Sequence, residues 1–411
     1  MGSARTQYYR SSRCDLHRQC LGKKIVRTCW IQCERYNHTK PILRNDHKTT
    51  HESTRCCVGT YGATWCTRHN RTYIKKSVTY TDEQLKQETE RLYEKLKHTE
   101  WSRDDVDVIA PMTLEINIRK KEQNAIILAH SYQTPDIMYG VADFLGDSYS
   151  LSKIAAEHPA DKIIFCSVHF MGETAKILSP EKDVLVPAMA GCSLAESITA
   201  EDVRELRTQH PNAGVVCYVN TSAAVKAECD VCCTSANVVD VIDAMPQDEV
   251  IFVPDKLMGE NVQKLTKKKL ILWDGTCIVH ELFTVDTIKE IRAQHPGVKI
   301  LAHTECNSSV VDAVDMAGST SDMLRYIASS DAQDIMLVTE CGITDRVKTE
   351  FVDKHIVGAC SLCPYMKKIM LRDILVALKN PRPDQIIEIP EDIRIKAKQS
   401  LDRMLEIVPK K

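Results

Sequence analysis

The sequence predicts an α/β protein in which three similar units, each with a short parallel sheet, pack around a pseudo-threefold axis. Two observations support this fold class. Between residues 125 and 338, short apolar runs alternate with helical stretches, and runs buried on both faces and separated by helices are typical of parallel sheets. The same strand–turn–helix pattern also recurs about every 85 residues, which indicates an internal repeat.

The first 78 residues differ from the rest of the 411-residue chain. They hold 16 Lys and Arg against 4 Asp and Glu, together with seven of the 18 cysteines, and their apolar residues follow no period. We expect a basic, Cys-rich and poorly ordered extension, or a wrongly chosen start site. Two alternatives stay open for this segment, a transit peptide such as one for a plastid, and a zinc site.

Ordered structure is expected from residue 79 onward. Thr81 and Gln84 have capping-box spacing, and the leucines that follow share one helical face, so residues 79–123 are predicted to be helical. The repeat divides the remainder into three αβα units. Their predicted ranges are 124–200, completed by C-terminal helices in 365–411, then 201–285, and finally 286–364.

The turns that follow the first strand of each repeat contain acid–base candidates. The repeat aligns 126–152 with 214–240 and 298–325. Loops at the carboxyl ends of parallel strands are the usual ligand sites of α/β sheets, and a buried Glu near a His can act as general acid or base. A lone buried His is also common as a satisfied core residue. The candidates are His130, Tyr132, Tyr218, Asn220, His303 and Glu305.

The second turn of each repeat places a hydroxyl where a helix begins. Ser148, Ser235 and Thr320 hold these equivalent positions. Backbone N–H groups and hydroxyls at such a place can bind an anion, although helix capping alone would also explain each residue. We expect the set to bind anionic groups of a ligand.

Each unit also contains a strand–turn–Cys–helix element, read as AGCSLAES, DGTCIVHE and GACSLCPYM. Cys192, Cys277 and Cys363 are equivalent in these elements, so the pseudo-threefold axis would bring three thiolates together. Structural zinc takes four ligands, whereas a 4Fe–4S cluster on three thiolates keeps one iron open as a Lewis acid. Buried cysteines are often only small core residues, but three at the repeat spacing favour a cluster.

Two CxxC pairs are weaker signals. Either pair could be a thiol–disulfide switch or half of a zinc site. Cys363 belongs to the repeat and Cys360 does not, so Cys360 is the candidate partner of Cys363 for reversible oxidation. Cys229 and Cys232 form the other pair. They lie at the second turn of the second unit, and we expect them to be core residues.

From about Ile109 to Met404, the sequence resembles the quinolinate synthases, the A protein of de novo NAD biosynthesis. The resemblance implies three similar three-layer αβα units with one cluster cysteine from each. It also implies condensation of iminoaspartate with dihydroxyacetone phosphate to quinolinate, with loss of phosphate and two waters and a 4Fe–4S cluster as Lewis acid. The resemblance rests on the motifs ILAHSYQ, GDSYSLS, CSVHFMGETAKIL, GCSLAES, CYVNTSA, CTSAN, DGTCIVH, AHTEC, GSTSDM and CPYMKK.

The resemblance also implies roles for the site residues. The three cysteines of the repeat resemble the cluster ligands. Glu305 is similar to the family's acid–base carboxylate, with His303 beside it. Tyr132 resembles the tyrosine that assists isomerisation and dehydration, with His130 in the same loop. The implied substrate contacts are Tyr218, Asn220, His280, Ser148, Ser235 and Thr320.

Three positions depart from the family's usual motifs. Ser131 stands for Asn, Tyr149 for Leu and Thr304 for Pro. None replaces a proposed chemical group, but we expect Thr304 to loosen the loop that holds Glu305. L-aspartate oxidase or aspartate dehydrogenase is an expected functional partner that would supply iminoaspartate.

Other functional classes fit the sequence less well. No apolar run reaches the roughly 18 residues of a membrane span, and the net charge of −2 suggests no polyanionic partner. The basic extension would permit weak phosphate contacts but has no reading motif, so we expect no specific nucleic acid. The absence of a secretory signal favours the cytoplasm. Another cluster-dependent lyase is the main alternative, and a redox sensor on an inactive scaffold is disfavoured by Glu305 and His303.

Overall fold

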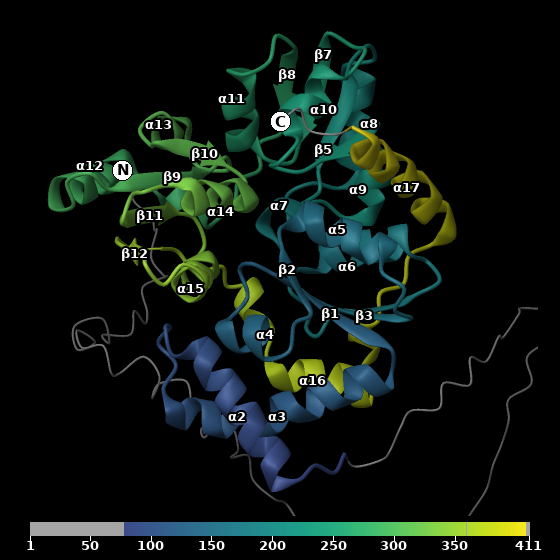
Figure 1. Ribbon diagram of the computed structural model, residues 1–411. Helices are drawn as coiled ribbons and strands as arrows, with labels where there is room; N and C mark the ends of the chain where they lie inside the picture. Colours follow the sequence, from purple (N-terminus) through teal and green to yellow (C-terminus); the bar gives the residue numbers. More distant parts are fainter. Residues whose placement is uncertain (1–77, 359, 408–411) are drawn as a thin grey trace, which may run out of the picture. The chain divides into compact units, whose positions relative to one another are not determined.

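Figure 1 shows the computed structural model of the chain, which describes residues 78–358 and 360–407. The predictions made for the basic extension therefore lie outside the described residues, except at position 78. Within the described part, no helix combines the length and the apolar character that crossing a bilayer requires.

Two helices open the described part, α2 (Asp82–Leu96) and α3 (Arg103–Glu122). Both begin with a capping box, and that of α2 joins Thr81 to Gln84 as predicted. The apolar faces of the two helices pack on each other, with Leu92 of α2 fully buried between them. These helices lead the chain into the first sheet.

Three four-stranded parallel sheets follow, and their strand orders are equivalent. In each, the first strand of the unit lies between the second and the third, and the fourth strand is at an edge. The predicted fold class of three similar α/β units is therefore confirmed. The strands are β1 (Ala125–His130), β2 (Phe144–Gly146), β3 (Lys162–Cys166), β4 (Asp183–Leu185), β5 (Gly214–Tyr218), β6 (Val231–Cys233), β7 (Glu249–Val253), β8 (Lys269–Leu272), β9 (Lys299–His303), β10 (Met316–Gly318), β11 (Asp334–Val338) and β12 (His355–Ile356).

Helices connect the strands in the same order in every unit, because parallel neighbours need crossover connections. One helix follows each of the first three strands. These are α4 (Pro135–Gly140), α5 (Ser148–Glu157) and α6 (His169–Leu178), then α9 (Ala223–Ala227), α10 (Val238–Asp243) and α11 (Lys256–Gln263), and then α13 (Ser308–Val311), α14 (Thr320–Ser329) and α15 (Cys341–Glu350).

The fourth strand of each unit leads to a short helix and then to a longer one. The segments are α7 (Ser193–Glu196) with α8 (Ala200–Gln209), η2 (His280–Leu282) with α12 (Val285–Gln294), and η3 (Met366–Lys368) with α16 (Leu371–Lys379). The chain then ends with η4 (Pro383–Gln385) and α17 (Glu391–Glu406). In Figure 1, α16 lies beside α3 below the first sheet, and α17 lies beside α9.

The apolar core explains why the central strands read as unbroken hydrophobic runs. All six residues of β1 are buried, as are the five residues of β5, because helices cover both faces of each sheet. One large cluster of buried residues joins the first and second sheets and reaches the third. The three units therefore share a core, and the carboxyl ends of their strands face a common space.

Candidate active site

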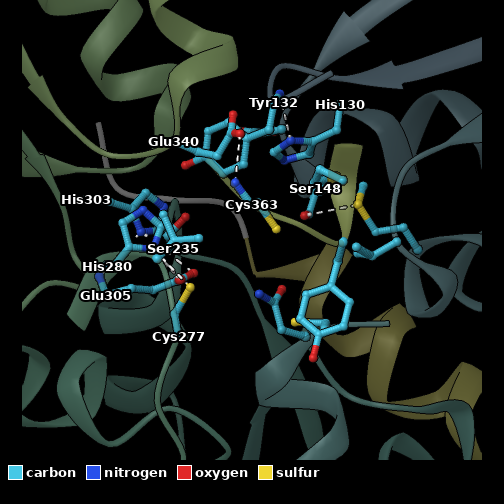
Figure 2. Close-up of a pocket in the computed structure, with 18 of the residues that line it drawn as sticks. His130, Tyr132, Ser148, Ser235, Cys277, His280, His303, Glu305, Glu340 and Cys363 are labelled. Atoms are coloured by element: carbon cyan, nitrogen blue, oxygen red, sulfur yellow. Dashed lines mark hydrogen bonds and ion pairs between the residues drawn. The ribbon is translucent and has the colours of Figure 1, made fainter. Parts of the chain in front are cut away.

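A single pocket collects the loops of all three units (Figure 2). Its empty space, counting the open mouth, is about 760 Å³. All thirteen residues singled out in the sequence line it. They are His130, Tyr132, Ser148, Cys192, Tyr218, Asn220, Ser235, Cys277, His280, His303, Glu305, Thr320 and Cys363.

The register of the sheets explains why the first turns meet there. His130, Tyr218 and His303 each end the first strand of a unit, and each pairs with the last residue of the second strand. The side chains that follow these strand ends therefore project from equivalent places. Tyr132, Asn220 and Glu305 all lie two residues beyond the strand end, and all line the pocket.

The three cysteines occupy equivalent places just before a short helix. Backbone N–H groups two and three residues further on hydrogen-bond to each sulfur atom, those of Leu194 and Ala195 in the case of Cys192. Figure 2 shows the sulfur atoms of Cys277 and Cys363 directed into the same space. Among the described residues, no other cysteine lines the pocket.

These thiols are held in their neutral form by their surroundings. Burial raises the pKa of Cys192 to about 12 and the pKa of Cys277 well above its ordinary value, and the nearby Glu305 carboxylate adds to both effects. Burial also raises the pKa of Cys363. Three buried thiolates would need cationic compensation, which is what an iron–sulfur cluster supplies.

A hydrogen-bonded chain runs across the pocket from one tyrosine to another. The Tyr218 hydroxyl donates to Glu305 Oε1 at 2.6 Å, and Glu305 Oε2 lies 2.8 Å from His280 Nδ1. His280 Nε2 lies 2.9 Å from Thr339 Oγ1, which is 2.7 Å from the Tyr132 hydroxyl. The chain thus connects side chains from all three units.

The electrostatics of this chain separate a base from two acids. Burial raises the pKa of Glu305, but His303, His280 and the Tyr218 hydroxyl more than offset it and hold that pKa below its ordinary value. Burial and the Glu305 charge raise the pKa of Tyr132 and of Tyr218 well above the usual range. At neutral pH the carboxylate is therefore ionised and both hydroxyls keep their protons.

The two histidines at the strand ends are neutral at the same pH. Burial lowers the pKa of His130 to about 4 and that of His303 to about 4. His280 and His303 also stack, with ring centroids 4.7 Å apart. The imidazoles can therefore accept or pass protons without adding fixed positive charge.

The hydroxyls of the second turns surround a different part of the pocket. Ser148 is the first residue of α5 and Thr320 is the first residue of α14, where free N–H groups favour an anion. Ser235 lies in the turn before α10. Among residues 78–358 and 360–407, the buried Asn220 Oδ1 atom has no hydrogen-bond partner, so it is available to a ligand.

Two residues that contact the predicted site residues escaped the sequence analysis. Thr339 links His280 to Tyr132, and Glu340 accepts the backbone N–H of Cys363 at 3.0 Å while pairing with Lys367 at 3.0 Å. Both residues follow β11, the third strand of its unit. The sequence analysis searched only the turns after the first and second strands, and a search of the turns after the third strands would have found them. Thr339 completes the proton path, and Glu340 positions the third cysteine.

The expected pairing of Cys360 with Cys363 is wrong. The structure joins Cys360 to Cys341 by a disulfide and leaves Cys363 free. The physical reason is that Ser361 pairs with Glu340 beside β11, which brings Cys360 next to the start of α15. The cysteines at 229 and 232 are buried core residues, as predicted.

The departures from the family motifs are accommodated locally. The loop around Thr304 is anchored, because Asn261 donates to the carbonyls of Thr304 and Cys306 at 2.9 and 2.8 Å, so the expected loosening is not seen. Ser131 donates to the Gly146 carbonyl and accepts from Arg346. Tyr149 lines the pocket itself.

Comparisons with known proteins identify the family of the chain. A family model described as quinolinate synthetase A protein matches residues 114–406. The quinolinate synthase of Agrobacterium fabrum is 46% identical over 321 residues, which cover 77% of this chain and 90% of that protein. Those of Caulobacter vibrioides and Xylella fastidiosa are 43% and 47% identical, over 79% and 70% of this chain and 89% and 85% of the relatives. The chain therefore belongs to the quinolinate synthetase A protein family.

Proposed function

We propose that the chain is a quinolinate synthase that condenses iminoaspartate with dihydroxyacetone phosphate, with loss of phosphate and two waters. The observation that supports this most directly is one pocket that combines three equivalent cysteines with the Tyr218–Glu305–His280–Thr339–Tyr132 chain. A thiolate set and an acid–base set in the same pocket suit a reaction that needs both Lewis acid and proton transfer.

Cys192, Cys277 and Cys363 would hold a 4Fe–4S cluster. Their convergence from three units and the absence of another described cysteine in the pocket fit a cluster with three protein ligands. The amide N–H groups behind each sulfur stabilise the thiolate form that such ligands need. When bound, the cluster supplies Lewis-acid activation of substrate oxygen or nitrogen.

The hydrogen-bonded chain would carry the protons of the dehydrations. Glu305, ionised at neutral pH, takes a proton from the substrate, and Tyr132, protonated, gives one to the departing hydroxyl. His280 and Thr339 lie between them, so the proton gained at Glu305 can replace the one lost at Tyr132. One water leaves per proton moved, and the chain returns to its starting state.

The remaining residues would bind the anionic ends of the substrates. Both proposed substrates carry carboxylate or phosphate groups, and Ser148, Ser235 and Thr320 surround the helix starts that favour such groups. Asn220 offers a free buried acceptor to a substrate N–H or O–H group. An L-aspartate oxidase or an aspartate dehydrogenase would supply the iminoaspartate.

The test is anaerobic reconstitution with iron and sulfide, followed by an iron count, a visible spectrum and an assay for quinolinate. We expect about four irons per chain and quinolinate from the two substrates. Cys277→Ala should lose both, whereas Cys229→Ala, which changes a buried core thiol outside the pocket, should keep both. A cluster without quinolinate would favour another cluster-dependent lyase, and no cluster would overturn the ligand assignment.

A further inference from the structure

Three metal-ligand atoms on one wall of the pocket lie close enough to share a single ion. The Cys277 sulfur, a ring nitrogen of His280 and a carboxylate oxygen of Glu305 all lie within 4.8 Å of one another. Figure 2 shows the three side chains gathered at one side of the pocket, apart from Cys363. Among the described residues this is the one such group, and the other two pocket cysteines are not in it.

The distances suit a mononuclear tetrahedral ion. His280 Nδ1 lies 3.2 Å from Cys277 Sγ and 2.8 Å from Glu305 Oε2, so it sits between the other two ligand atoms. Zinc bonds to sulfur at about 2.3 Å and to nitrogen or oxygen at about 2.0–2.2 Å, which at tetrahedral angles separates these atoms by about 3.4–3.6 Å. The two contacts of His280 Nδ1 would lengthen by roughly half an ångström, and the separation between Cys277 Sγ and the Glu305 oxygen, at most 4.8 Å, would close to about 3.6 Å.

The chemistry of the three groups also suits a divalent ion. A thiolate and a carboxylate together balance two positive charges, and both are removed from bulk water in this wall. Thr339 hydrogen-bonds to His280 Nε2 and orients the ring so that Nδ1 faces the other two ligands. His303 is not a competing ligand through Nδ1, because that atom accepts the Glu305 backbone N–H.

We propose that the chain without its cluster binds one borderline-soft divalent ion, such as Zn²⁺ or Co²⁺, through Cys277, His280 and Glu305. Three protein ligands leave a fourth position open to the pocket, as in exchangeable rather than structural zinc sites. Because Cys277 is also a proposed cluster ligand, the ion and the cluster exclude each other. The bound ion also occupies Glu305 and His280, so it disconnects the proton path.

Cobalt is the probe, because its thiolate charge-transfer and ligand-field absorption reports the ligand set. The full chain, freed of iron and sulfide, is titrated with Co²⁺ under anaerobic conditions. The seven cysteines of residues 1–78 give the same background in every variant, so difference spectra between variants are compared. We expect one equivalent whose spectrum is absent in Cys277→Ser and whose affinity falls at least about tenfold in His280→Gln and Glu305→Gln.

Cys192→Ser and Cys363→Ser are the matched controls, since they remove pocket thiols outside the group. Both should bind Co²⁺ as the unchanged chain does, although neither should assemble a full cluster. Thermal unfolding of each variant confirms that it is folded. Equal loss of the signal in Cys192→Ser or Cys363→Ser would overturn the proposal, because the ion would then sit among the three thiolates. Absence of a pocket-specific signal in the unchanged chain would also overturn it.

A second measurement tests the exclusion. Loading the iron-free chain with one equivalent of Zn²⁺ before cluster reconstitution should lower the iron count. Removing the Zn²⁺ with a chelator before reconstitution should restore it. A normal iron count with Zn²⁺ retained would contradict shared use of Cys277. These readouts do not involve turnover, so a failure to form quinolinate would overturn the proposed function and leave the ion site untouched.

Discussion

The first and third units have the same arrangement at the carboxyl end of their first strand. β1 ends at His130 and β9 ends at His303, and both imidazoles are buried with a pKa lowered to about 4. Nδ1 of each accepts a backbone N–H from two residues further on, that of Tyr132 at 3.2 Å and that of Glu305 at 3.3 Å. The two loops differ mainly in the side chain at this last position.

The difference between Tyr132 and Glu305 gives the two loops opposite electrostatics. Burial raises the pKa of Tyr132, whereas the partners of Glu305 overcome burial and lower its pKa. The equivalent residue of the second unit, Asn220, does not titrate. The repeated backbone thus holds a protonated hydroxyl in one copy and an ionised carboxylate in another, and both line one pocket.

Removing the carboxylate of Glu305, the proposed base, should have the largest effect on kcat. Glu305→Gln keeps the shape of the side chain but not its negative charge, so kcat should fall about 10³-fold. The iron count of the reconstituted variant should not change, because Glu305 is not a proposed cluster ligand. Glu281→Gln, an exposed change nearby, is the control and should keep full activity. A fall of less than tenfold for Glu305→Gln would remove Glu305 from the mechanism.

Removing the acid should have the next largest effect. Tyr132→Phe retains the ring that contacts His130 edge-on and deletes the hydroxyl, so kcat should fall about 10²-fold with the visible spectrum of the cluster unchanged. Tyr139→Phe, in the same unit but outside the pocket, should behave like the unchanged enzyme. Similar rates for the two variants would show that Tyr132 is not the proton donor.

The scaffold itself predicts a pH dependence of stability. The pKa of His130 is about 4 in the folded chain and about 6.5 when unfolded, so the unfolded state binds more protons between these values. Stability should therefore fall as the pH is lowered through this window, with His130 accounting for on the order of 2 kcal/mol between pH 7 and pH 5.

Denaturant unfolding at pH 7 and pH 5 measures this contribution. His130→Asn, which keeps an acceptor for the Tyr132 N–H, should lose less stability on acidification than the unchanged chain. The interpretation fails if acidification destabilises His130→Asn and the unchanged chain equally.

Interrupting the hydrogen-bonded chain between Glu305 and Tyr132 should have the smallest effect on kcat. Thr339→Val removes the hydroxyl between His280 and Tyr132 while both ends stay in place, so kcat should fall about tenfold at constant KM. Thr339→Ser should restore most of the rate, because it returns the hydroxyl. If Ser and Val behave alike, Thr339 fills space and does not relay protons.

Local patterns were enough to predict most of this molecule. The apolar runs and the repeat identified the three parallel sheets, because strands covered on both faces must read as continuous hydrophobic segments. The repeat also placed equivalent positions such as His130 and His303 at the carboxyl ends of the first strands. Cys192, Cys277 and Cys363 were found because the repeat relates them along the chain.

Contacts between side chains of different units could not be predicted from the sequence. Thr339 meets His280 and Tyr132 across 59 and 207 residues, and no periodicity links these positions. Cys360 pairs with Cys341 and not with its CxxC neighbour because the chain passes beside β11 before it reaches the pocket. The sequence by itself determined the fold class and the chemical groups, which depend on local burial and repeat spacing. Only the tertiary structure decided which groups share hydrogen bonds or a disulfide, because these depend on distances between segments far apart in the sequence.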